Sequence, residues 1–157
     1  MKGLFLLPLL LLGAFPRPAA PPFIDPTGTY ILKGEVRKNK ITGHSGEIRA
    51  RLLDQHKVAL CLYMNNGYPD YASGAMIDTL DYEEDRTFYQ PAHDSSCFLI
   101  FIFRFRTVEI MEVYSDPHSG CGFQQGIMIP ATFEKSSSDV PVIQDLSKRG
   151  LAAGGSS

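Results

Sequence analysis

The alternation of apolar and polar residues along the chain predicts a succession of short β-strands. The clearest case is 47–52, where charged and apolar residues alternate strictly, so that one face meets water and the other meets the core. No window of eleven residues carries a convincing helical repeat, although a short helix over 142–147 stays an alternative there. The expected strands cover 27–34, 47–52, 58–64, 75–81, 87–89, 97–105, 107–114 and 126–134.

The run over 97–105 is rich in aromatic and β-branched residues and predicts a central core strand. Its alternate side chains, Leu99, Phe101, Phe103 and Phe105, are expected to line the interior of the domain. These side chains either fill that interior or line a cavity for an apolar ligand. An exposed edge beside such a run would promote aggregation, so we expect the sheet to close on itself.

Eight short strands in meander order, joined by loops of two to ten residues, favour a barrel over a sandwich. The fold class that we expect is therefore all-β, with a single antiparallel meander of about eight strands closed into a small barrel.

The two ends of the chain differ in composition from this central part. Residues 1–20 are predicted to be a signal peptide, because Lys2 precedes an apolar run of about nine residues at 4–12. That run is well short of the ~20 residues that span a bilayer, and a short N-terminal anchor is the alternative. The predicted organisation continues with a Pro-rich lead-in at 21–26, a β-barrel domain at 27–135 and a mostly disordered extension at 136–157. The expected location is periplasmic or extracellular, with no membrane span.

Charge excludes some partners. Removing Lys2 and Arg17 with the signal peptide leaves 13 basic against 17 acidic residues, a net charge of −4. The basic residues form no stripe in the sequence, which argues against binding to nucleic acid or to an anionic membrane surface.

Three cysteines allow one internal disulfide, and the strand pattern favours Cys97–Cys121. If the sixth and seventh expected strands form a hairpin, the start of one lies beside the loop that leaves the other. Cys61 lies within a strand and is expected to be a reduced, buried residue, although pairing with Cys97 or Cys121 is the alternative. All three would stay reduced in a compartment that is not oxidising.

The order and spacing of several short motifs resemble a family of small secreted bacterial calycin-like β-barrel domains of uncharacterised function. The motifs are Gly28-Thr29-Tyr30, the segments 45–48, 67–74 and 77–80, the strand that begins at Cys97, Cys121-Gly122-Phe123, and Lys135 after a late aromatic residue. The resemblance implies a calycin-like barrel and export, and it implies no substrate.

The sequence offers little catalytic chemistry. His93 and Asp94 in one loop and Asp116 and His118 in another do not match a standard metal-ligand spacing. The segment 93–96 has the residue types of a nucleophile system, but neighbours on a loop point in different directions. Acidic residues at 83–85 indicate a solvated hairpin tip. We therefore expect no enzyme activity, no catalytic or metal-binding residues and no cofactor.

The loop at 65–74 is the best candidate for recognition, since loops that carry their own aromatic residues tend to be functional. Asn65, Tyr68, Asp70 and Tyr71 are its expected contact residues, and the alternative is that both tyrosines fold back over the barrel mouth. The predicted function is a non-enzymatic binding domain, similar to an inhibitor or an immunity protein, that engages a protein partner through the loops 65–74 and 115–125. The alternatives are a carrier of a small apolar ligand inside the barrel and a metal-dependent or Ser/His hydrolase.

Overall fold

The computed structural model describes residues 22–147, and within this range the chain forms nine β-strands and no α-helix. The strands are β1 (Gly28–Leu32), β2 (Glu35–Arg37), β3 (Lys40–Asp54), β4 (Lys57–Gly67), β5 (Ser73–Asp81), β6 (Arg86–Tyr89), β7 (Cys97–Phe103), β8 (Thr107–Tyr114) and β9 (Ala131–Ser137). None of the residues 22–147 belongs to a helix with the length and apolar character needed to cross a membrane.

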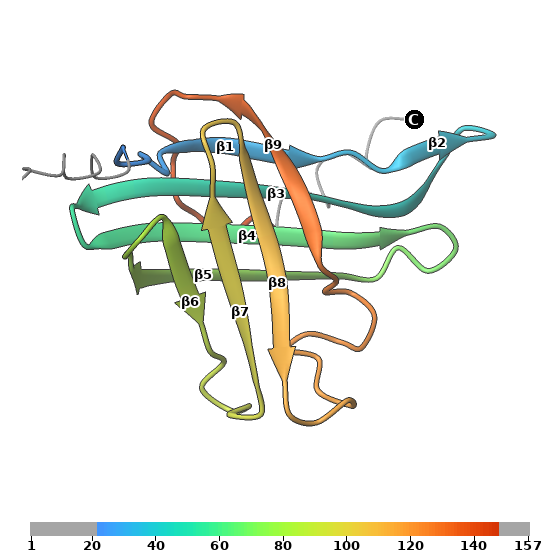
Figure 1. Ribbon diagram of the computed structural model, residues 1–157. Helices are drawn as coiled ribbons and strands as arrows, with labels where there is room; N and C mark the ends of the chain where they lie inside the picture. The colour runs from blue at the N-terminus through green and yellow to red at the C-terminus, as the bar shows by residue number, and fades with distance from the viewer. Residues whose placement is uncertain (1–21, 148–157) are drawn as a thin grey trace, which may run out of the picture.

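The strands form one antiparallel sheet that is nearly closed into a barrel (Figure 1). Its order is β5-β4-β3-β1-β9-β8-β7-β6, so most of the main strands pair with their neighbours in the chain and the last strand pairs with the first. β5 and β6 are joined by a tight turn without a continuous ladder between them. In Figure 1, β1, β3, β4 and β5 form one layer, and β6 to β9 cross in front of it. The predicted all-β meander is confirmed.

Large side chains from both layers fill the interior. Leu60, Leu62, Phe101 and Phe133 are fully buried, as are most inward-facing residues of β3, β4, β7 and β8. Burying a side chain of this size contributes roughly 1.5–3 kcal/mol, so this packing is the main source of stability. The interior that the alternation predicted is therefore filled by side chains.

The N-terminal segment closes one end of this core. The hydroxyl of Tyr30 donates to the carbonyl of Pro26 at 2.9 Å, and the hydroxyl of Tyr82 donates to the carbonyl of Ile24 at 2.7 Å. Both rings meet Phe103 edge to face, with ring centroids 5.9 and 5.8 Å apart. The residues expected to be a Pro-rich lead-in, so far as they are described, are thus tied to the barrel.

Several expected element boundaries were wrong. The expected strands 27–34 and 47–52 left the residues between them without a strand, but the turn there is confined to Lys38 and Asn39, whose φ angles of 49° and 60° suit a two-residue hairpin loop. The chain then enters β3 directly. The last strand was expected at 126–134 and lies at Ala131–Ser137, because residues 126–130 cover the barrel mouth instead.

Phe105 is the one expected interior residue that lies outside. Leu99, Phe101 and Phe103 are fully buried, whereas Phe105 is 82% exposed. β7 ends at Phe103, and residues 104–106 form the turn to β8, so the alternation of faces stops before Phe105.

The expected disordered extension is ordered in its first part. Residues 138–147 pass behind the layer that holds β3 and β4 (Figure 1), and the side chain of Leu146 is buried. The Arg49 guanidinium donates to the carbonyl of Val142 at 3.2 Å, which fixes this segment to β3. The predicted signal peptide at 1–20 and the end of the extension at 148–157 lie outside the described residues.

Candidate binding surface

The loops β6–β7 and β8–β9 lie together at one end of the barrel, and the predicted disulfide joins them. Cys97 and Cys121 are bonded, with their Cα atoms 5.2 Å apart, which confirms this pairing over the two that involve Cys61. The bridge closes a separation of 24 residues, for which loop entropy predicts about 3 kcal/mol of stabilisation. It therefore fixes the long β8–β9 loop to the start of β7.

A carboxylate makes a second link between these loops. Asp94 accepts the hydroxyls of Ser96 and Ser119, each at 2.5 Å, and these hydrogen bonds hold the pKa of Asp94 below its ordinary value, that of Ser119 having the larger effect. The two serines belong to different loops, so Asp94 joins β6–β7 to β8–β9 beside the disulfide. This is the geometry of a structural crosslink.

The histidines of these loops do not take part in that link. His93 and His118 are exposed, and among the side-chain hydrogen bonds of residues 22–147 neither imidazole reaches Ser95 or Ser96. The same range holds no group of three or more His, Cys, Asp or Glu side chains that could bind a metal ion. The hydrolase hypothesis gains nothing from this arrangement.

The β8–β9 loop, and not the tyrosines, covers the barrel mouth. Cys121, Ile127 and Met128 are buried in the core cluster, and Phe123 packs on Gly74, where an added Cβ would overlap its ring. The alternative in which Tyr68 and Tyr71 fold back as a lid was wrong, because the mouth is already occupied.

Hydrogen bonds instead hold the β4–β5 loop in one conformation away from the mouth. The side chain of Asn65 accepts the Gly67 N–H at 2.7 Å and donates to the Tyr71 carbonyl at 2.8 Å. The Tyr68 N–H donates to the Ile41 carbonyl at 2.8 Å. Gly67 has a φ of 74° and lies so close to β3 that a Cβ would come within 2.5 Å of the Gly43 carbonyl oxygen. The loop is thus docked on the long strand β3.

Tyr68 and Tyr71 point into solvent from this fixed loop. They are 46% and 45% exposed, and their rings meet edge to face with centroids 6.3 Å apart. The ammonium of Lys40, at the start of β3, lies 3.8 Å from the centre of the Tyr68 ring. Asp70 is exposed at the tip between the two tyrosines. We call Tyr68, Tyr71 and Lys40 the tyrosine platform.

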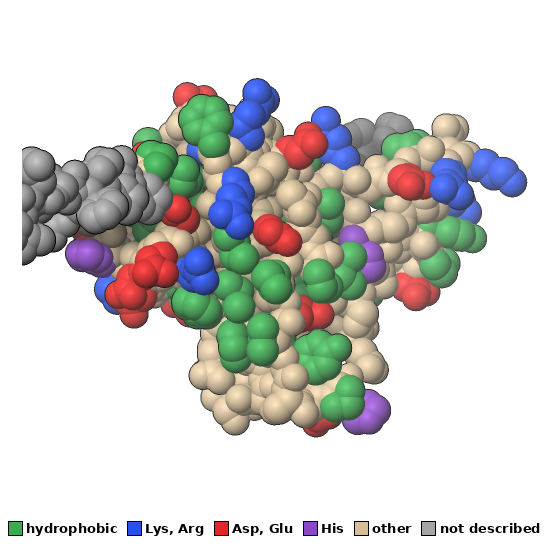
Figure 2. Space-filling model, in the orientation of Figure 1, with side chains coloured by type: hydrophobic (Ala, Val, Ile, Leu, Met, Phe, Trp, Pro, Cys, Tyr) green, Lys and Arg blue, Asp and Glu red, His purple; other side chains and the backbone are tan. Residues whose placement is uncertain are grey.

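The β2–β3 hairpin extends this surface with cations and apolar side chains. Arg37, Lys38 and Lys40 lie at or beside its tip, and Glu35 pairs with Arg37 at 2.6 Å. Val36 and Ile41 are exposed on the same hairpin. Figure 2 shows the basic side chains gathered where Figure 1 places β2. The net charge of the whole chain does not indicate this cluster, although four of the residues 33–40 are basic.

A shallow cavity of about 570 Å³ lies beneath the hairpin. Lys33, Arg37 and His44 line one side and residues 129–132 line the other. His44 Nε2 lies 2.8 Å from the carbonyl oxygen of Gly126, so the hairpin base is joined to the β8–β9 loop. The hairpin and the loops therefore form one continuous surface.

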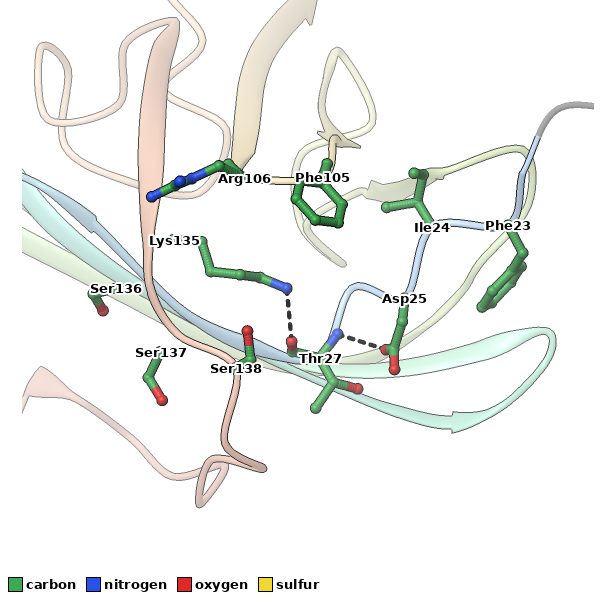
Figure 3. A pocket seen from close by; sticks show the side chains of 10 residues that line it. All are labelled: Phe23, Ile24, Asp25, Thr27, Phe105, Arg106, Lys135, Ser136, Ser137 and Ser138. Atoms are coloured by element: carbon green, nitrogen blue, oxygen red, sulfur yellow. Dashed lines mark hydrogen bonds between the residues drawn. The ribbon is translucent and has the colours of Figure 1, made fainter.

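A second cavity, of about 560 Å³, lies at the opposite end of the barrel (Figure 3). Lys135 reaches into it, donates to the Thr27 carbonyl at 3.0 Å and lies 5.1 Å from the centre of the Tyr30 ring. Burial lowers the pKa of Lys135, and the charge of Asp25 partly opposes that effect. These contacts fasten β9 to the N-terminal segment and so help to close this end of the barrel.

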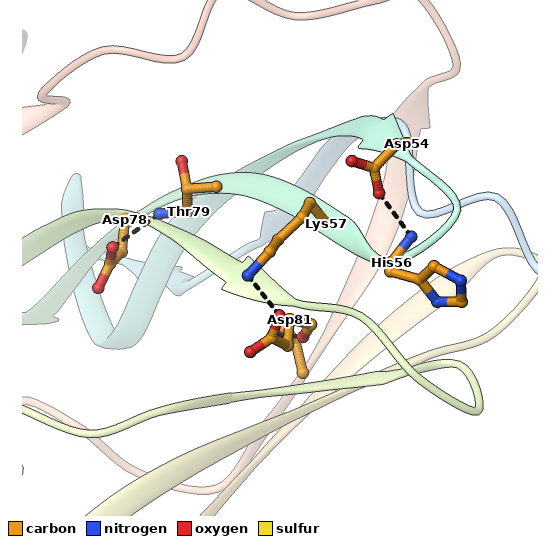
Figure 4. A network of polar contacts seen from close by, with 7 residues as sticks. Asp54, His56, Lys57, Asp78, Thr79 and Asp81 are labelled. Carbon is orange, nitrogen blue, oxygen red and sulfur yellow. Dashed lines mark hydrogen bonds and ion pairs between the residues drawn. The ribbon is translucent and has the colours of Figure 1, made fainter.

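The polar network in Figure 4 is also structural. Lys57 and Asp81 form an ion pair between paired positions of β4 and β5, and Asp54 accepts the His56 N–H at 2.7 Å in the β3–β4 turn. These contacts stabilise a turn and a strand pair that water surrounds.

Comparisons of the chain with protein-family models, with curated proteins and with solved structures find no match.

Proposed function

We propose that this protein is an exported, non-enzymatic binding domain of calycin-like type, and that it engages a protein partner through the tyrosine platform and the neighbouring β2–β3 hairpin. The observation that carries the proposal is the pair of exposed tyrosines on a loop whose backbone is already fixed by hydrogen bonds. Ordering a loop on binding costs free energy, and a loop that is already ordered avoids that cost.

The residue types support a protein partner. Tyrosine is enriched at the energetically dominant positions of protein interfaces, because it offers a large contact area with few rotatable bonds. Tyr71 also has a φ of 51°, a conformation that costs energy for a residue other than glycine and is often found at functional sites. The hairpin cations favour a partner whose contact surface is acidic, because complementary charges steer association.

The export part of the proposal rests on the leader-like sequence at 1–20 and on the disulfide, which is compatible with an oxidising compartment. The packed interior weighs against the alternative of an apolar carrier, since Leu99, Phe101 and Phe103 occupy the space that such a ligand would need.

The test is affinity capture from periplasmic and extracellular extracts, followed by mass spectrometry of bound proteins and co-purified lipids. We expect a protein partner that binds the native chain and loses at least roughly tenfold in affinity for the Tyr68→Ala/Tyr71→Ala variant. Phe105→Ala is the matched control, because it removes an exposed aromatic ring at the opposite end of the barrel. A partner that binds the double variant unchanged would remove the support for this proposal, and a stoichiometric lipid would favour the carrier.

A further inference from the structure

The outer face of β6, β7 and β8 is apolar although nothing in residues 22–147 covers it. Six side chains make up this face: Phe88, Phe98, Ile100, Ile102, Met111 and Val113. Phe88 is 51% exposed and Met111 is 41% exposed. Figure 2 looks onto this face and shows hydrophobic side chains gathered over the three strands. An exposed apolar patch on one side of a sheet marks an interaction surface.

The register of the strands arranges this face in rows. Phe88, Ile100 and Met111 lie side by side in the middle row. The next row towards the β7–β8 turn holds Arg86, Ile102 and Glu109, again side by side. This row thus has a cation on β6, an apolar centre on β7 and an anion on β8. Both charged side chains are exposed.

We propose that this face is a self-association surface, on which a second copy of the chain packs to form a symmetric dimer. A twofold axis parallel to β7 would place β6 of one copy over β8 of the other and keep each row opposite itself. Arg86 would then face Glu109 of the second copy, twice by symmetry, while Phe88 faces Met111 and Ile100 faces its own equivalent. This arrangement requires the strands of the two copies to be nearly aligned. That agrees with the general packing of two sheets face to face, whose strand directions stay within about 30° of each other.

The other in-plane axis, perpendicular to the strands, does not give this match. It would place β6 over β6 and β8 over β8 with the rows reversed, so that Glu109 would lie over the apolar Val113. A buried charge without a partner is costly, so the charge pattern selects the parallel axis. The self-complementary arrangement of Arg86 and Glu109 is therefore the feature that identifies a second copy as the occupant.

Sedimentation velocity of the purified protein over a range of concentrations tests this proposal. We expect a reversible dimer whose dissociation constant rises at least roughly tenfold in Arg86→Glu and in Glu109→Arg, because each places like charges opposite one another. The double variant Arg86→Glu/Glu109→Arg restores the opposite charges and should dimerise like the native chain. Met111→Lys, a change at an exposed position in the middle row, should give a monomer whose thermal unfolding curve matches that of the native chain at concentrations where the native chain is also monomeric.

Phe105→Ser is the control, since it removes an exposed aromatic residue outside this face and should leave the dimer intact. A monomeric native chain at all concentrations would overturn the proposal. A dimer that is indifferent to Met111→Lys and to both single charge reversals would overturn it as well, because a different surface would then hold the copies together. These outcomes are independent of the tyrosine platform, which lies on another part of the barrel.

Discussion

At the scale of single residues, two carboxyl groups respond to their surroundings in opposite ways. The hydroxyls of Ser119 and Ser96 hold the pKa of Asp94 down, because they stabilise its charged form. Burial raises the pKa of Glu112, an inward-facing residue opposite Leu99 in the β7–β8 pair. Asp94 therefore stabilises the folded state when it is ionised, whereas Glu112 destabilises the folded state when it is ionised.

For Asp94 we expect the substitution Asp94→Asn to lower Tm at pH 7. A folded-state pKa below the unfolded one contributes stability that is present above the unfolded pKa, near 4, and is lost as the pH falls through the folded-state pKa. The difference in Tm between the native protein and the Asp94→Asn variant should thus shrink steadily below about pH 4. This difference in Tm can be measured by thermal unfolding, with circular dichroism as the signal, from pH 7 to pH 2. A difference that is constant with pH would contradict a stabilising role for the ionised Asp94 crosslink.

For Glu112 the sign is reversed, and we expect Glu112→Gln to raise Tm at pH 7. A carboxyl whose folded-state pKa is raised opposes folding once the pH exceeds the unfolded pKa, near 4, and does so fully above the folded-state pKa. The gain should therefore disappear at pH 3. The same thermal scans test this, with Glu134→Gln, an exposed position on β9, as the control. A loss of Tm at pH 7 would show that the carboxylate has a stabilising partner.

At this scale the sequence predicted the disulfide, which depends on where a strand begins. It did not predict Phe105 correctly, because composition does not show where β7 ends. The pairing of Cys97 with Cys121 followed from the hairpin that their positions imply. Phe105 was placed in the interior because the apolar run continues past Phe103, where hydrogen bonding, and not composition, ends the strand. The contact of Lys40 with Tyr68 joins residues far apart in the chain, so no local sequence pattern predicts it.

At the scale of elements, the β4–β5 loop depends on the side chain of Asn65. We expect Asn65→Ala to lower the free energy of unfolding by about 1–3 kcal/mol, because it removes the acceptor for the Gly67 N–H and the donor to the Tyr71 carbonyl. Urea unfolding at pH 7 measures the change, and an unchanged m-value would show that the rest of the fold persists. Thr79→Ala on β5 is an exposed control. A change below about 0.3 kcal/mol would mean that the loop does not depend on these bonds.

The strands were easier to predict than the segments between them. Alternation located the cores of β3, β4, β7 and β8, because each has one buried and one wetter face. The β2–β3 hairpin escaped notice, since its residues are exposed on both faces and carry no alternation. The hydrophobic pattern therefore did not predict this hairpin or the basic side chains at its tip.

At the scale of the whole molecule, the chain after β9 forms a cover on the outside of the barrel. Cys61 faces outward from β4, opposite Arg49 of β3, yet it is fully buried. Burial raises the pKa of its thiol, and a hydrogen bond from the Gln144 backbone partly opposes this. Residues 138–147 supply both Gln144 and the carbonyl that binds Arg49. The loss of periodicity after Ser136 predicted a disordered segment. Residues 138–147 are nevertheless held by hydrogen bonds of their backbone, and such bonds do not require a periodic pattern of side chains.

This packing predicts how Cys61 reacts. In the intact protein we expect a neutral-pH thiol reagent to modify Cys61 very slowly, because the thiol is inaccessible and its raised pKa keeps it protonated. Truncation after Ser137 should increase the rate at least roughly tenfold. Leu146→Asp, which places a charge at a buried contact of the same segment, should have a similar effect without shortening the chain. Far-UV circular dichroism would establish that both variants retain the barrel. Equal rates in the intact and truncated proteins would mean that the strands themselves, and not the returning chain, bury this cysteine.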